Sequence, residues 1–360
     1  MLNKINKMAR NLKFLQDLVQ TPSQSGMEHA ASQRFIDECK SGGCKEEFLD
    51  NFGNGVVSRE NHSTTGGFKT ILLSGHVDEI PCLVTMITDN GFLHIMSAGG
   101  FDRRPLVGAY IQVLSEDGNW INGVIGKKPI HLEEDGEYEK ATKMEDLLVD
   151  LGCNSKEEVE NLGIHPGSYV TYRKGLEDLT FGPKKELIMS EGLDDKIAVY
   201  IVAEVMKRIN VPNGYKIYGA SMAGEETGTR GCQVVAGRLN PDISIDLDVT
   251  FSTDSDAGIS KEKLGDIELG KGVVISYGPD KSRKLAKELK DLAKKNGIKY
   301  QEEATRAGGT NTDAIQRHAK DCETMLLSIP NRNMHTNVEI CHWDDVEAAI
   351  DLLVKWIESL

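Results

Sequence analysis

The sequence predicts an α/β protein whose main domain is interrupted by a smaller all-β domain. Apolar strand-like runs alternate with amphipathic helical segments toward both ends of the chain, and short β-like runs separated by glycine turns fill its middle. With 360 residues, the chain also exceeds the size at which a single core usually stops growing. We therefore expect residues 1–81 and 183–360 to form one domain around an insertion of residues 82–182.

Helices and strands of the main domain can be placed from apolar spacing. Leu12, Leu15 and Leu18 recur at helical spacing within residues 8–20, and a second helix is expected over residues 27–40. Later helices are expected in KIAVYIVAEVMKRI, in SRKLAKELKDLAKKNG, which Gly297 would cap, and over residues 344–360. The predicted strands are KTILLSGHVDEI, YKIYGASM, DISIDLDVTF, GVVISYG and TMLLSIP.

The insertion contains short runs typical of a small antiparallel domain. Its predicted strands are CLVTMIT, GFLHIMS, AYIQVLS, INGVIG and SYVTYRK. One short helix is expected at MEDLLVDLG.

Composition excludes several classes of partner. The formal net charge of −14 disfavours nucleic acid and anionic membranes, because both are polyanions. The seven cysteines are an odd number without paired spacing, which favours a reducing compartment and indicates no disulfide framework. No run approaches the ~18 apolar residues that span a bilayer, and no signal peptide is apparent. We expect a cytoplasmic protein without a membrane anchor.

Polar clusters stand at the ends of predicted strands, where the sites of α/β proteins collect. They are GHVDE (His76, Asp78, Glu79), EGLDDK (Glu191, Asp194, Asp195), GEETG (Glu225, Glu226), DLDVT (Asp246, Asp248) and NMHTN (His335). Each cluster alone could be solvated loop residues, a helix cap or a hydrogen-bonded structural histidine. Together they supply the imidazoles, carboxylates and unligated base that a hydrolytic site with two divalent metals requires.

Neighbouring acids in these clusters should have different roles. Adjacent aspartates cannot easily serve one ion, so we expect Asp194 to bridge two metals and Asp195 to cap the helix that begins at Lys196. The side chains of Glu225 and Glu226 diverge, so one can bind metal while the other moves a proton. Asp78 lies two residues after His76, on the same side of a strand, and can orient its imidazole.

The sequence resembles the glutamyl-aminopeptidase-like family of dinuclear metallo-aminopeptidases over nearly its whole length. SGHVDEI, GLDDK, AGEETGTRG, DVT and MHTNVE carry the resemblance, and GVIGKKPIHL and GIHPGSYV extend it into the insertion. It implies a mixed-sheet α/β/α zinc-peptidase-like catalytic domain. It also implies that the insertion is a small all-β domain, of barrel or PDZ-like form, that serves homo-oligomerisation, as in the family's dodecameric tetrahedral assemblies.

The resemblance also implies roles for individual residues. The metal ligands would be His76 and Asp248 on one ion, Glu226 and His335 on the other, and Asp194 on both. Glu225 becomes the general base and Asp78 the acid that orients His76, and a cis peptide is expected between Asp194 and Asp195. Asp246 is the alternative to Asp248, because both lie on one strand face. The cofactors would be two divalent ions per subunit, zinc or cobalt first, with manganese also compatible.

The function implied is removal of the N-terminal residue from short peptides, with Glu225 taking the proton of a metal-bridged water. The alternatives are a deacylase or carboxypeptidase on the same dinuclear core, and a non-catalytic peptide-binding relative. The chain departs from the family at Pro81, at Lys196, where arginine is usual, and in the longer turn of residues 308–314. These departures concern specificity, for which the sequence offers only Arg230, Arg306 and Arg332 as cations that could favour acidic side chains.

Overall fold

A mixed eight-stranded sheet forms the main domain in the computed structural model, which describes residues 10–62, 67–134, 142–174, 179–254 and 258–360. Its central strands β12, β3, β13 and β16 are parallel, whereas β1, β2 and β14 introduce antiparallel pairs. In spatial order the strands are β1 (Lys45–Leu49), β2 (Gly55–Asn61), β12 (Tyr215–Met222), β3 (Lys69–His76), β13 (Ile243–Phe251), β16 (Glu323–Asn331), β14 (Val273–Tyr277) and β15 (Tyr300–Ala304).

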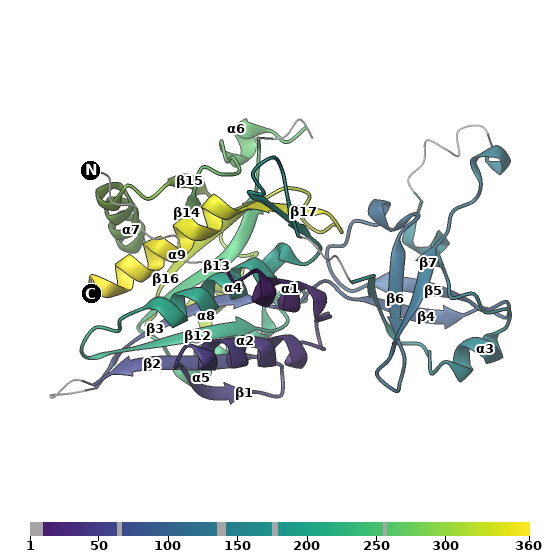
Figure 1. Cartoon of the computed structure of the whole chain (residues 1–360), viewed down its shortest axis with the longest axis horizontal. Helices are drawn as coiled ribbons and strands as arrows, with labels where there is room; N and C mark the ends of the chain where they lie inside the picture. The colour runs from purple at the N-terminus through teal and green to yellow at the C-terminus, as the bar shows by residue number, and fades with distance from the viewer. Residues whose placement is uncertain (1–9, 63–66, 135–141, 175–178, 255–257) are drawn as a thin grey trace.

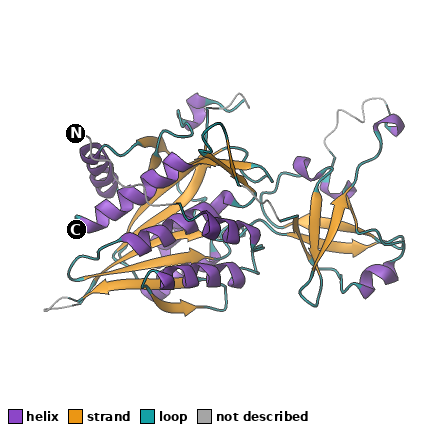
Figure 2. Cartoon of the chain, viewed as in Figure 1, coloured by secondary structure: helices purple, strands orange, loops and turns teal. Residues whose placement is uncertain are grey.

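Helices cover both faces of this sheet (Figure 2). The alternation of side chains along β3 explains the two layers: Ile71 and Leu73 enter the larger core, and Leu72 enters the smaller one. On the larger face lie α1 (Leu12–Gln20), α2 (His29–Ser41), α4 (Leu193–Arg208), α7 (Arg283–Asn296) and α9 (Trp343–Glu358). On the smaller face lie α5 (Arg230–Leu239) and α8 (Asn311–His318); α6 (Lys261–Leu264) is a short exposed helix.

The first helix ends where predicted but begins later, and the predicted cap of α7 is present. The helix expected over residues 8–20 begins at Leu12, where Asn11 caps it, while Met8 and Ala9 lie outside the described residues. Gly297 ends α7 in the left-handed conformation, with φ of 67°. Of the helices described, none is long and apolar enough to cross a membrane.

The middle of the chain forms a closed six-stranded barrel beside the main domain (Figure 1). Around the barrel the strands are β4 (Cys82–Ile87), β5 (Phe92–Ser97), β8 (Leu148–Asp150), β7 (Trp120–Ile125), β6 (Tyr110–Leu114) and β9 (Tyr169–Tyr172). Short helical segments between them are η1 (Arg104–Leu106), η2 (Ile130–Leu132), η3 (Met144–Asp146) and α3 (Lys156–Asn161). The mixed-sheet α/β fold with an inserted all-β domain is thus confirmed.

The helix expected at MEDLLVDLG was wrong. Met144–Asp146 makes only one 3₁₀ turn, and Leu148–Asp150 is the strand β8, which pairs with both β5 and β7. Val149 is fully buried in the barrel core. Closing the barrel requires a sixth strand here, and this pairing overrides the local helical preference of the segment.

A three-stranded sheet lies next to the start of α4. It consists of β10 (Thr180–Phe181), β11 (Leu187–Ser190) and β17 (Glu339–His342). Strand β11 leads directly into α4, and β17 leads into α9. This small sheet therefore places Asp194 and Glu339, from distant parts of the sequence, side by side.

Candidate metal centre

The first histidine stands at the carboxyl end of β3, in the middle of the large sheet. His76 is almost fully buried. Its Nδ1 lies 3.1 Å from the backbone carbonyl of Asp78 and 3.5 Å from the Asp78 carboxylate. Because a carbonyl only accepts hydrogen bonds, Nδ1 carries the proton, and the lone pair of Nε2 faces the site.

Asp194 lies between two imidazoles. Its Oδ1 is 3.1 Å from Nε2 of His76, and its Oδ2 is 3.2 Å from Nε2 of His335. The Asp194–Asp195 peptide is cis, as expected. Nδ1 of His335 contacts the carbonyl of Gly100 at 2.9 Å, so this imidazole too presents Nε2 to the carboxylate.

The contacts of Asp194 with the two histidines show whether these residues are suited to hold metal ions. With Nδ1 protonated on both rings, two Nε2 lone pairs face two carboxylate oxygens, an arrangement that needs a cation in between. Without a metal, only protonated imidazoles could supply this positive charge. Consistent with this, the contact with Asp194 raises the pKa of His335 to about 9. Divalent ions bound to the same atoms would replace these protons.

The turn after β12 carries the two neighbouring glutamates. The Asp78 carboxylate accepts hydrogen bonds from the backbone N–H groups of Glu225, at 2.9 Å, and Glu226, at 3.2 Å. Glu226 Oε1 lies 3.5 Å from Nε2 of His335. Glu226 forms a potential metal-binding group with His76 and Asp194, all ligand atoms lying within 4.8 Å of one another. The Glu225 carboxylate is in neither potential ligand group and lines the adjoining cavity.

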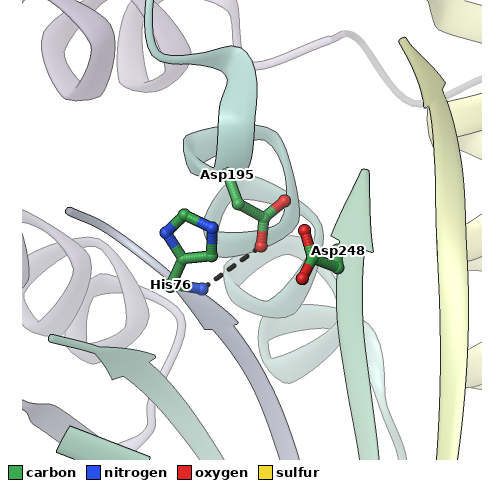
Figure 3. A group of neighbouring side chains, drawn as sticks. All are labelled: His76, Asp195 and Asp248. Atoms are coloured by element: carbon green, nitrogen blue, oxygen red, sulfur yellow. Dashed lines mark hydrogen bonds between the residues drawn. The ribbon is translucent and has the colours of Figure 1, made fainter. Parts of the chain in front are cut away.

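A second potential metal-binding group combines His76 with Asp195 and Asp248, which come from β3, α4 and β13 (Figure 3). The expected capping role of Asp195 was wrong, since its Oδ2 accepts a hydrogen bond from the backbone N–H of His76 at 3.2 Å. The residue that could substitute for Asp248 has another partner: Asp246 Oδ1 accepts a hydrogen bond from Ser74 at 2.6 Å. The clustering therefore favours Asp248 over Asp246 as a ligand.

Negative charge is in excess throughout the centre. Burial raises the pKa of Glu225 to about 7 and that of Glu226 to about 8, with Asp194 adding to both. Burial likewise raises the pKa of Asp248 well above its usual range. Among the described residues, no lysine or arginine forms an ion pair with these carboxylates. Divalent cations would supply the missing positive charge.

Three residues without a predicted role hold the centre together. Glu339 accepts hydrogen bonds from the backbone N–H groups of Asp194, at 2.9 Å, and His335, at 2.8 Å. Ser25 donates to Asp78 at 2.7 Å, and Glu28 accepts from Gly224 at 3.2 Å. Glu339 belongs to the MHTNVE motif, which could have drawn attention to it; no sequence signal marks Ser25 or Glu28.

A cavity of about 320 Å³ opens beside the centre. Its lining combines residues of the centre with residues of β15 and of the 305–310 turn; those of the centre are His76, Asp194, Glu225, Glu226, Asp248 and His335. Of the three arginines considered as specificity residues, Arg306 lines this cavity. Arg332 is held by Asp254 at 2.7 and 2.9 Å, and Arg230 lines a different cavity.

Fold and site together define a metal-dependent hydrolase of the zinc-peptidase-like class. The model of the M42 glutamyl aminopeptidase family matches residues 53–352. A lysyl aminopeptidase of Pyrococcus furiosus is 28% identical over 97% of both chains. An aminopeptidase structure from Desulfurococcus kamchatkensis has a TM-score of 0.86 at 27% identity and covers 97% of this chain and 94% of its own.

A further structure is that of the Pyrococcus horikoshii TET1 peptidase, which can assemble into a tetrahedron or a large octahedral shell. It is 30% identical, has a TM-score of 0.81, and covers 96% of this chain and 98% of its own. The chain belongs to the M42 glutamyl aminopeptidase family and is an aminopeptidase.

Proposed function

We propose that the chain removes N-terminal residues from short peptides at a centre of two divalent ions. The observation that carries this proposal is the position of Asp194, whose two oxygens lie 3.1 and 3.2 Å from the Nε2 atoms of two histidines. A carboxylate shared in this way is suited to bridging two ions, one beside each imidazole.

The ligand set we propose is His76 and Asp248 on one ion, Glu226 and His335 on the other, and Asp194 on both. Asp195 lies close enough to His76 and Asp248 to add negative charge on that side. When bound, such ions act as Lewis acids toward an amide carbonyl and lower the pKa of a water molecule. Nitrogen and oxygen ligands suit zinc, cobalt and manganese, so we propose these three as candidates.

Glu225 is the general base in this proposal. Glu225 lines the cavity and belongs to neither potential ligand group, so its carboxylate is available to take a proton from the attacking water and deliver it to the leaving amine. Asp78 positions the base, because its carboxylate holds the backbone N–H groups of both Glu225 and Glu226. The same aspartate also contacts Nδ1 of His76, so one side chain orients a ligand and the base together.

An activity panel tests the function. The purified protein is assayed on aminoacyl anilides, N-acetylated amino acids and C-terminal peptide substrates, each with added zinc, cobalt or manganese. We expect hydrolysis of the anilides only, with a metal content near two ions per subunit. Hydrolysis of the N-acetylated or C-terminal substrates instead would support a deacylase or a carboxypeptidase and contradict the proposal.

We also propose that residues 82–182 mediate self-association. The barrel exposes large apolar side chains, among them Met86, Tyr110, Ile130 and Leu132. The TET1 peptidase, with 30% identity, was solved as a dodecamer. Analytical ultracentrifugation of the full chain should show a single large species, and Tyr110→Glu should shift it toward smaller ones. A monomer in both cases would overturn the assignment.

A cytoplasmic location is part of the proposal. All seven cysteines are unpaired, which is usual where thiols are kept reduced. Fractionation of cells followed by immunoblotting tests this, and recovery of the protein in a secreted fraction would contradict it.

A further inference from the structure

The lining of the cavity beside the metal centre contains a further carboxylate, outside the proposed ligand set. Glu303, on β15, lines the same cavity as the metal-centre residues His76 and Asp194. The residue is 8% exposed. In the described part of the chain, no lysine or arginine forms an ion pair with it. A negative charge in the wall of a cavity attracts a cationic ligand group, because the surrounding protein screens it less than water does.

Neutral hydroxyl groups hold this carboxylate in place. Thr250 donates a hydrogen bond to Glu303 Oε2 at 2.7 Å, and Ser276 donates to Oε1 at 2.5 Å. Ser276 is in turn 3.1 Å from Ser328, which also lines the cavity. Hydroxyl donors fix the orientation of a carboxylate without cancelling its charge. Glu303 is therefore positioned to accept a further, charged donor.

The two cationic residues that line the same cavity do not form an ion pair with Glu303. The ammonium of Lys281 lies 2.8 Å from Asp280 Oδ1 and 3.5 Å from the Arg306 carbonyl, so a carboxylate already neutralises it. Arg306 is exposed, where water and salt screen its charge. Among the described residues of the cavity lining outside the metal centre, Glu303 is therefore the buried charge without an ion-pair partner.

The spacing between the metal centre and Glu303 matches a long side chain. Asp248 and Thr250 are two residues apart on β13 and share a face, which separates their Cα atoms by roughly 7 Å. Thr250 contacts Glu303 directly. A lysine side chain has a four-carbon stem and places its ammonium about 6 Å from its Cα. A substrate whose N-terminal amide is bound at the metal centre could thus reach Glu303 with its side chain.

We propose that Glu303 is a specificity-determining residue that selects peptides beginning with lysine or arginine. The inference rests on the proposed function, since it requires the N-terminal residue to occupy this cavity. The carboxylate binds the side-chain cation of the substrate, and the hydroxyls of Thr250 and Ser276 keep it oriented.

Matched substrates test the inference without any mutation. Lysine and norleucine anilides share the same aliphatic stem, but only lysine carries a charge. We expect kcat/KM for lysine to exceed that for norleucine about 10- to 100-fold, as for a hydrogen bond to a charged group. A ratio near one, or a preference for glutamate or aspartate that Arg306→Gln abolishes, would overturn the inference.

Variants on strand β15 then test whether Glu303 causes the preference for lysine. Glu303→Gln keeps the shape of the side chain and removes its charge, so it should reduce the lysine-to-norleucine ratio of kcat/KM at least tenfold. Glu302→Gln is the matched control, because Glu302 is the preceding residue of β15 and binds Lys290 and Tyr277 instead. If Glu303→Gln does not fold, Glu303→Asn gives the same test with a shorter, neutral side chain. An unchanged ratio in a folded Glu303 variant contradicts the proposal.

Binding provides an independent readout. In the Glu225→Gln protein, calorimetry should show tighter binding of Lys-Ala than of norleucyl-Ala, and Glu303→Gln in that background should remove the difference. Equal affinity of the Glu225→Gln protein for Lys-Ala and norleucyl-Ala would contradict the inference. The two proposals fail differently: inactivity on every anilide contradicts the aminopeptidase proposal, whereas activity without a lysine preference contradicts only the role of Glu303.

Discussion

The metal centre and a second group of buried charges both lie beside the start of α4, yet their charge balance is opposite. The second group, here called the lysine cluster, pairs two lysines with two glutamates. Lys174 Nζ lies 2.8 Å from Glu79 and 2.7 Å from Glu191, while Lys196 contacts Glu79 and donates to the Thr21 carbonyl at 2.9 Å. The metal centre has more carboxylates and no lysine or arginine partner among the described residues.

The difference separates a structural cluster from a functional one. Burial alone would raise the pKa of Glu79, but Lys174 and Lys196 lower it to about 2, whereas burial still raises the pKa of Glu191 to about 7. Two ammonium groups of the chain nevertheless face the two carboxylates of this cluster. At the metal centre, burial and Asp194 raise the pKa of Glu226 to about 8, and no lysine or arginine among the described residues pairs with it. Buried acids that the chain leaves unbalanced therefore indicate where external cations bind.

The largest effect should come from the shared carboxylate. Asp194→Asn removes the charge between the two histidines, so metal content should fall and peptidase activity should drop below detection. Elemental analysis and anilide hydrolysis measure both. Asp246→Asn is the matched control, because Asp246 is a neighbouring buried acid bonded to Ser74, and it should keep its metal. Full metal content in the Asp194→Asn protein would contradict the proposed role of Asp194 as a metal ligand. It would also contradict the contrast drawn between the metal centre and the lysine cluster.

Removing the proposed base, Glu225, should affect catalysis alone. Glu225→Gln cannot accept a proton, so we expect kcat to fall about 10²- to 10⁴-fold with metal content unchanged. Glu226→Gln should instead lose metal. If Glu225→Gln lost metal and Glu226→Gln did not, the two roles would have to be exchanged.

The lysine cluster should affect stability rather than metal content. Lys196→Met leaves Glu79 with one cation fewer in a buried position, which should lower the free energy of unfolding by about 3–5 kcal/mol in urea titrations. The double variant Glu79→Gln/Lys196→Met removes the orphaned charge and should regain much of the loss. A double variant no more stable than the single one would show that the pair does not act through charge.

A smaller effect should appear in acid. The pKa of Glu79 is lowered to about 2 from 4.5, so its stabilising contribution is complete above about pH 4.5 and is lost as the pH falls toward 2. This shift corresponds to about 3 kcal/mol of unfolding free energy. Urea titrations across this range should show that Glu79→Gln reduces the acid dependence relative to the wild type. Identical pH dependence in both proteins would contradict the assignment.

Much of the fold was predictable because its signals are local. The apolar periodicity of α9 and α7 and the apolar runs of β3, β12 and β13 each lie within one short stretch of sequence. The residues of these patterns are the ones buried in the two cores of the main domain. The prediction for the β8 segment was wrong because this segment has no local signal for a strand. Its pairing with β5 and β7 is decided by closure of the barrel.

The sequence by itself determined which residue types gather at the sheet edge, because the parallel strands β3, β12 and β13 bring their carboxyl ends together. Only the tertiary structure decided which partner each acidic residue contacts. Asp195 bonds to His76 from 119 residues away rather than capping its own helix, and Glu339 holds Asp194 across 145 residues. Such contacts depend on the packing of distant elements, and so do the hydrogen bonds from Thr250 and Ser276 to Glu303 in the lining of the cavity.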